Sequence, residues 1–203
     1  MSEVTTAYGP ARLDIDHPAG TPRALLVLGH GAGGGVDAVD LVAVRDAAVA
    51  AGATVARATQ PYRVAGRRAP APARQLDAAF TAVVAAARAA VPAGTPLVVG
   101  GRSSGARVAC RTAAELGAAG VLCLAFPLHP PGRPEKTRLP ELEQVTVPVL
   151  IVQGESDPFG MPPDAPNRRV VRLKGNHSLK SDVRGLRAAV TAFLSGGNDG
   201  DVD

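Results

Sequence analysis

Short apolar runs rich in Val and Leu alternate along this chain with segments whose apolar residues recur at helical spacing. The runs are continuously apolar, which is typical of strands that are covered on both faces in a mostly parallel sheet. They predict strands over residues 24–29, 54–59, 97–101, 120–126, 147–153 and 169–173. Helices are predicted over residues 37–51, 76–91, 104–116 and 183–194. Gly52 and Gly117 stand where the first and third of these helices should end.

This alternation of strand and helix predicts an α/β fold with right-handed crossovers. We expect a mostly parallel central sheet of six or seven strands flanked by helices, with residues 4–15 supplying one or two antiparallel edge strands. A chain of 203 residues has the length of one domain. We therefore expect a single domain over residues 1–195. Residues 196–203 carry Gly, Asn and Asp without apolar anchors, and we expect them to form a disordered acidic tail.

Composition argues against several classes of function. Aromatic residues make up 3% of the chain and Trp is absent, so platforms for base stacking are not expected. The formal net charge is +4, but the arginines are scattered and the densest cluster is Arg63, Arg67 and Arg68. A solvated surface is therefore favoured over a nucleic-acid site. No stretch approaches the roughly 18 apolar residues that span a bilayer, and we expect no membrane partner.

The two cysteines, Cys110 and Cys123, stand in apolar segments. Two such residues supply neither a disulfide framework nor the ligand spacing of a zinc site. We therefore expect a cytoplasmic protein in a reducing setting, with no metal and no cofactor.

The most informative segment is Gly-Arg-Ser-Ser-Gly at residues 101–105, which directly follows a predicted strand and precedes a predicted helix. This is G-x-S-x-G in the strand-turn-helix context of a nucleophile elbow. Gly101 and Gly105 remove side chains that would clash in the strained turn, so that the Ser103 hydroxyl stands exposed above the sheet. Ser103 is therefore the predicted nucleophile, the alternative being a Gly/Ser-rich connection without a catalytic role.

A serine nucleophile needs a base, and the base needs an acid to orient it; in this fold they follow in the order Ser, Asp, His. Asp157 comes just after the predicted strand 147–153, and His177 follows the last predicted strand. Glu155 in the same loop is an alternative acid. The remaining histidines, which lack this order and place, are His17, His30 and His129.

Glycines recur after the first predicted strand, in Gly-His-Gly-Ala-Gly-Gly-Gly at residues 29–35. A His-Gly pair here is typical of the loop that builds an oxyanion hole together with the residue after the nucleophile. The predicted backbone N–H donors are accordingly those of Ala32 and Ser104.

Residues 29–34 also satisfy the G-x-G-x-x-G pattern of a dinucleotide-binding site. Such a site calls for Asp or Glu at the end of the next strand, and residues 54–62 contain neither. Arg57 or Arg63 could bind a 2′-phosphate instead, so this alternative stays open. A Walker-type phosphate loop is excluded because no Lys-Ser/Thr follows.

Four motifs together resemble the small capless α/β-hydrolase-like family that includes a testis-expressed protein and a subunit of the NSL chromatin acetyltransferase complex. They lie at residues 60–68, 100–107, 127–134 and 176–180. The resemblance runs over about residues 24–194 and implies a capless α/β-hydrolase fold. It also implies that Ser103, Asp157 and His177 occupy the triad positions, and it implies no particular substrate.

Two segments could contact substrate. Residues 62–68 follow a strand end and could place Arg63, Arg67 or Arg68 beside the pocket, where guanidinium groups bind carboxylates or phosphates. A solvated or salt-bridged loop is the alternative. His129, in a Pro-rich loop, is a further candidate for substrate contact, the alternative being a bond to local backbone.

The sequence therefore predicts a serine hydrolase of esterase or acyl-hydrolase type that acts on a small-molecule ester. The alternative from another class is a non-catalytic interaction module that keeps the fold. Residues 127–146, where larger relatives insert a cap, contain five prolines and leave room for one short helix at most. We therefore expect no cap domain and a preference for short acyl groups.

Overall fold

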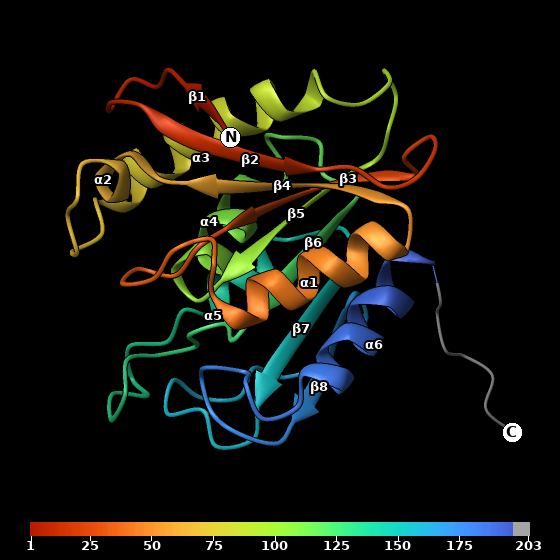
Figure 1. Cartoon of the computed structure of the whole chain (residues 1–203). Coiled ribbons are helices and arrows are strands. Elements are labelled where there is room, and N and C mark those ends of the chain that lie inside the picture. Colours follow the sequence, from red (N-terminus) through yellow and green to blue (C-terminus); the bar gives the residue numbers. More distant parts are fainter. Residues whose placement is uncertain (197–203) are drawn as a thin grey trace, which may run out of the picture.

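A single mixed sheet forms the centre of the computed structural model, which describes residues 1–196 (Figure 1). Its strands within these residues are β1 Ser2–Val4, β2 Ala11–Asp16, β3 Ala24–Gly29, β4 Ala53–Thr59, β5 Leu97–Arg102, β6 Gly120–Leu124, β7 Val149–Gly154 and β8 Arg168–Leu173. They pair in the order β1-β2-β4-β3-β5-β6-β7-β8. Strands β3 to β8 are parallel, whereas β2 runs antiparallel to β4 and β1 antiparallel to β2.

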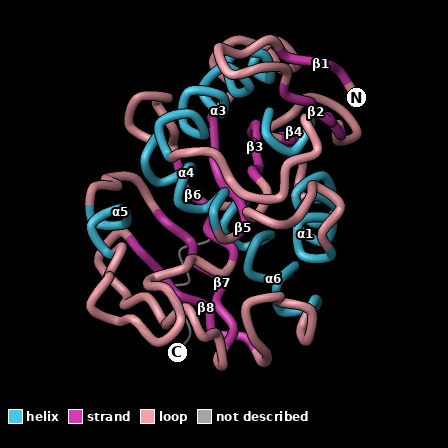
Figure 2. Tube along the Cα trace, turned by 90° about the vertical axis from the view of Figure 1, so that its left-hand side faces the viewer, coloured by secondary structure: helices cyan, strands magenta, loops and turns pink. Residues whose placement is uncertain are grey.

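Helices cover both faces of this sheet (Figures 1 and 2). In the described chain they are α1 Val39–Ala50, α2 Pro61–Val64, α3 Ala73–Arg88, α4 Ser104–Thr112, α5 Leu139–Glu143 and α6 Val183–Leu194. Helices α1 and α6 pack together on one face, and α3 and α4 pack on the other. In β3, Leu26 and Leu28 join the core under α1, and Leu25 and Val27 join the core under α3 and α4. Because both faces are buried, the strand is apolar throughout.

The predicted fold class is confirmed, and the sheet is larger than expected. All six predicted strands are present, but the described residues form eight strands rather than six or seven. The extra two, β1 and β2, come from the opening segment, where both edge strands form. Hydrogen bonds from β2 to β4 satisfy a strand edge that would otherwise be open.

The helix boundaries differ from the predicted ones by a few residues. Helix α4 ends at Thr112, and the chain continues in turns to Gly117, whose φ is +61°. There the Ala118 N–H donates to Ala113 O at 3.0 Å and the Gly117 N–H to Ala114 O at 3.1 Å. This is a Schellman arrangement, which favours the glycine that the sequence supplies.

A thiol pair lies between α4 and β6. Cys110 on α4 and Cys123 on β6 are free, buried cysteines whose sulfur atoms are 3.5 Å apart. Both belong to the core on the α3 and α4 side of the sheet.

The carboxyl ends of the parallel strands meet at one edge of the sheet, the side that faces the viewer in Figure 2. Loops after β3, β5, β7 and β8 carry the predicted glycine run, Ser103, Asp157 and His177. Between β6 and β7 the described chain contains one short helix, α5, and no cap domain.

Of the predicted tail, residues 197–203 lie outside the described part of the chain. Among the described residues, no helix combines the length and the apolar character that crossing a membrane requires.

Candidate active site

Ser103 stands on a sharp turn between β5 and α4. Its backbone has φ 52° and ψ −110°, and its N–H donates to Leu124 O of the neighbouring β6 at 2.8 Å. A β-carbon at Gly101 would lie 2.5 Å from the carbonyl oxygen of Gly29. One at Gly105 would lie within 3 Å of the same carbonyl group. The two glycines therefore let the turn pack directly against the end of β3, as the motif requires.

His177 connects Ser103 to a buried carboxylate. Its Nδ1 lies 2.9 Å from Oδ2 of Asp157, and its Nε2 lies 3.0 Å from Oγ of Ser103. A carboxylate only accepts hydrogen bonds, so Nδ1 carries the proton and Nε2 is left to accept from the serine hydroxyl. Glu155, the alternative acid, is exposed at the surface.

Asp157 is fixed by contacts that the sequence did not predict. Its side chain is fully buried, Oδ2 accepts a second hydrogen bond from Nε2 of Gln153 at 2.9 Å, and Oδ1 accepts from the Phe159 N–H at 2.9 Å. The Phe159 ring packs on the His177 imidazole with centroids 4.3 Å apart. The one signal in the sequence for Gln153 is a polar residue at the end of an otherwise apolar run.

The glycine-rich loop after β3 approaches the nucleophile. A β-carbon at Gly31 would lie 3.6 Å from the Ser103 β-carbon, and the Gly34 N–H donates to Gly31 O at 3.1 Å, so the loop turns around Ala32. Tyr62, at the start of α2, donates its hydroxyl to Ala32 O at 2.8 Å. Ser104 is the first residue of α4, where backbone N–H groups have no partner within the helix.

His30 ties this loop to the end of β4. Its Nε2 accepts from the Gln60 N–H at 3.1 Å, and its Nδ1–H donates to Gly31 O at 2.8 Å. Burial, together with the positive charge of Arg63, lowers the pKa of His30 although the bond to Gly31 opposes the shift. His30 is therefore a neutral, structural histidine.

The glycine run does not have the geometry of a dinucleotide site. That motif needs a helix that begins within the glycines, so that its N-terminus faces the pyrophosphate. Here α1 begins at Val39, after an intervening loop that follows Gly34. The spacing argues against the dinucleotide alternative.

The arginine cluster lies at the surface. Arg67 and Arg68 are exposed, and Nη1 of Arg63 donates to Arg67 O at 3.2 Å. Arg67 also borders a small cavity of about 90 Å³ beside Tyr62 and Gln60. Among the described residues, no hydrogen bond or ion pair joins the cluster to Ser103 or His177, so its role toward an anionic substrate stays a prediction.

His129 contacts the loop that carries the acid. Its Nδ1–H donates to Pro130 O at 2.9 Å, and its backbone N–H donates to Phe159 O at 3.0 Å. Its ring also fills the space beside Gly160. These contacts favour the structural interpretation of His129. Among the described residues, no three His, Cys, Asp or Glu side chains gather as a metal site requires.

Comparisons with known proteins identify the family and the fold. No curated protein matches the chain. Residues 22–185 match the family described as alpha/beta hydrolase domain.

Solved structures with the same fold are distant in sequence. An α/β serine hydrolase homologue from Coxiella burnetii is 18% identical, with a TM-score of 0.77 over 95% of this chain and 96% of that one. A serine hydrolase without lid from Xanthomonas campestris is 21% identical, with a TM-score of 0.79 over 96% and 93%. Est1E from Butyrivibrio proteoclasticus is 18% identical, with a TM-score of 0.78 over 97% and 98%, and has also been solved with ferulic acid bound.

Proposed function

Because the chain belongs to the α/β hydrolase domain family, we propose that it is a serine hydrolase that cleaves a small acyl substrate, most simply an ester. One observation carries the proposal: hydrogen bonds of 3.0 and 2.9 Å join Ser103 to His177 and His177 to Asp157. A nucleophile, a base and an orienting acid in this arrangement are what acyl transfer requires.

In the proposed reaction, Oγ of Ser103 attacks the acyl carbonyl carbon while Nε2 of His177 takes the hydroxyl proton. Asp157 holds the Nδ1 proton in place and stabilises the imidazolium that forms. The N–H groups of Ala32 and Ser104 donate to the negative oxygen of the tetrahedral intermediate. His177 then protonates the leaving alcohol, and a water molecule, activated by the same base, hydrolyses the acyl-enzyme.

The substrate is expected to be small because little of the chain can cover the site. Within the described residues, the connection between β6 and β7 holds only the short helix α5. Similarity to a serine hydrolase without lid supports the same expectation. The motifs at residues 60–68, 100–107, 127–134 and 176–180 support placing the chain in the small capless group of the family.

A fluorophosphonate probe tests the proposal, because it reacts only with an activated serine. The wild type should be labelled and should hydrolyse p-nitrophenyl acetate, and Ser103→Ala should do neither. Ser195→Ala, a change at the end of α6, is the matched control and should behave as the wild type. Labelling that persists in Ser103→Ala would contradict the assignment of the nucleophile. A folded wild type that is neither labelled nor active would favour the interaction module.

A further inference from the structure

The residue before the nucleophile has a side chain that the proposed reaction does not use. Arg102 ends β5, and its side chain is 20% exposed. Its Nη2 donates to the backbone oxygen of His177 at 3.2 Å. Its Nη1 lies beside the glycine loop, 3.0 Å from where a β-carbon of Gly31 would stand. The guanidinium is thus bonded to the loop that carries His177 and lies close to the glycine loop.

A buried carboxylate holds this guanidinium. Nε of Arg102 lies 2.7 Å from Oδ2 of Asp40, whose side chain is only 1% exposed. Burial raises the pKa of Asp40, while the charge of Arg102 and a hydrogen bond from the Leu41 N–H oppose that rise. Asp40 also lies in the first turn of α1, where the helix dipole favours a negative charge.

The loop that carries His177 needs such a restraint. Leu179, two residues after the histidine, is buried with φ +50°, a conformation that non-glycine residues adopt at a cost. Gly175, two residues before it, has φ +111°. A loop in this conformation keeps its shape only where surrounding contacts hold it.

We propose that Arg102 is a positioning residue: its ion pair with Asp40 anchors the guanidinium on α1, and the guanidinium fixes the main chain of His177 relative to Ser103. Arg102 touches no reacting atom. The inference rests on the proposed serine-hydrolase function and adds a determinant of the angle and distance at which the base meets the nucleophile. The planar guanidinium suits this task, because its several N–H donors let one side chain bond to a carboxylate and a carbonyl at the same time.

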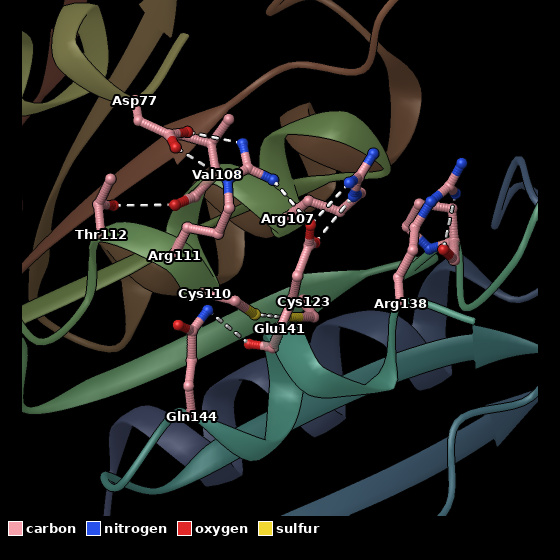
Figure 3. Close-up of polar contacts among 11 residues, drawn as sticks. Asp77, Arg107, Val108, Cys110, Arg111, Thr112, Cys123, Arg138, Glu141 and Gln144 are labelled. Atoms are coloured by element: carbon pink, nitrogen blue, oxygen red, sulfur yellow. Dashed lines mark hydrogen bonds and ion pairs between the residues drawn. The ribbon is translucent and has the colours of Figure 1, made fainter. Parts of the chain in front are cut away.

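Arg102→Met and Asp40→Asn test the inference, with Arg111→Met as the matched control. Arg111 has a similar exposure of 17% and a 2.6 Å ion pair with Asp77, but its partners are Asp77 on α3 and Glu141 on α5 (Figure 3), neither of which is in the triad. With p-nitrophenyl acetate, we expect Arg102→Met to lower kcat about 10- to 100-fold, as misplacement of a catalytic group does, with KM within about twofold. Asp40→Asn should lower kcat in the same direction. Arg111→Met should lose stability and keep kcat.

Arg102→Lys separates charge from geometry. An ammonium group can pair with Asp40 but lacks the fork that also reaches His177 O, so stability should recover more than kcat. Full recovery of kcat in Arg102→Lys would contradict the proposed contact with His177. The inference would be overturned if Arg102→Met and Asp40→Asn both had the same kcat as Arg111→Met.

A readout that needs no turnover separates this inference from the proposed function. The downfield proton resonance of Nδ1 of His177 reports its hydrogen bond to Asp157 in proton NMR spectra. We expect this resonance to broaden or shift in Arg102→Met and to stay unchanged in Arg111→Met. If the wild type neither reacts with fluorophosphonate nor hydrolyses esters, the proposed function fails, and the resonance still tests the positioning. An unchanged resonance in Arg102→Met would overturn it.

Discussion

At the scale of single residues, His30 and His177 show how surroundings decide what a histidine does. Both histidines lie at the carboxyl edge of the sheet, and in each of them both ring nitrogens form a hydrogen bond. His30 is buried and bonded only to backbone groups, whereas His177 lies between a carboxylate and a hydroxyl. The first arrangement fixes a loop, and the second can move a proton.

The burial of His30 predicts a dependence of stability on pH. Its pKa is lowered in the folded protein, while in the unfolded chain it is about 6.5. As the pH falls through about 6.5, the unfolded chain takes up a proton that the folded protein does not, so stability present above this pH is lost below it. Urea unfolding from pH 8 to 5 should show this loss. The amide oxygen of the new side chain in His30→Gln can accept from the Gln60 N–H but does not titrate. The free energy of unfolding should therefore depend less steeply on pH in this variant than in the wild type. An equal dependence on pH would contradict the prediction.

The hydroxyl of Tyr62 predicts an effect on rate. Its hydrogen bond to Ala32 O fixes the loop that we propose to hold the oxyanion. Tyr62→Phe should lower kcat about threefold to tenfold, because one hydrogen bond contributes about 1 kcal/mol. KM should change little. Tyr8→Phe, a change at an exposed tyrosine, is the control. A kcat of Tyr62→Phe equal to that of Tyr8→Phe would show that the loop does not need this hydrogen bond.

At the scale of helices, charged side chains fasten α5 to the neighbouring α4. Glu141 accepts bidentate bonds from Arg107 at 2.8 and 2.6 Å, and Arg111 joins Glu141 to Asp77 on α3 (Figure 3). Burial would raise the pKa of Glu141, but the bonds and charges of the two arginines hold it below its usual range. The pairs therefore stabilise the only helix between β6 and β7 in the described chain.

Removing this carboxylate should weaken the fold and leave the chemistry intact. Glu141→Gln leaves half-buried arginines short of a partner, so we expect a loss of about 1–3 kcal/mol at pH 7. Because the folded-state pKa of Glu141 is depressed, its contribution is present above about pH 4.5 and is lost as the pH falls further. Chemical unfolding at pH 7 and 4 measures both effects, with the exposed Glu143→Gln as control. Equal stability of the two variants at pH 7 would contradict the expectation.

Local patterns were enough to predict the elbow and most strands, because the motif and the apolar runs are contiguous in sequence. The supports of the site could not be predicted in this way. Tyr62 and its partner Ala32 are 30 residues apart, and Arg102 and its partner His177 are 75 residues apart. Such contacts depend on strand order and on the exact direction of a side chain, which neither composition nor periodicity specifies.

At the scale of the whole molecule, the open carboxyl edge predicts selectivity for short acyl groups. Each buried CH₂ contributes about 0.8 kcal/mol to binding, but only where the protein covers it. We expect kcat/KM for p-nitrophenyl esters to peak at about two to four acyl carbons, since α5 is too short to cover a longer chain. A series from acetate to dodecanoate measures this. An efficiency that rises to eight carbons or more would reveal a tunnel.

The thiol pair between α4 and β6 can be used to measure how often α4, the helix that follows the proposed nucleophile, moves away from the sheet. The hydrogen bond with Cys110 and, to a smaller extent, burial raise the pKa of the Cys123 thiol well above its ordinary value. Alkylating reagents attack the exposed thiolate, so neither sulfur can react until α4 separates from the sheet. The rate of alkylation under native conditions therefore reports how often this interface opens. Helix α4 begins at the residue after the elbow, so the same measurement reports how firmly the proposed nucleophile is held.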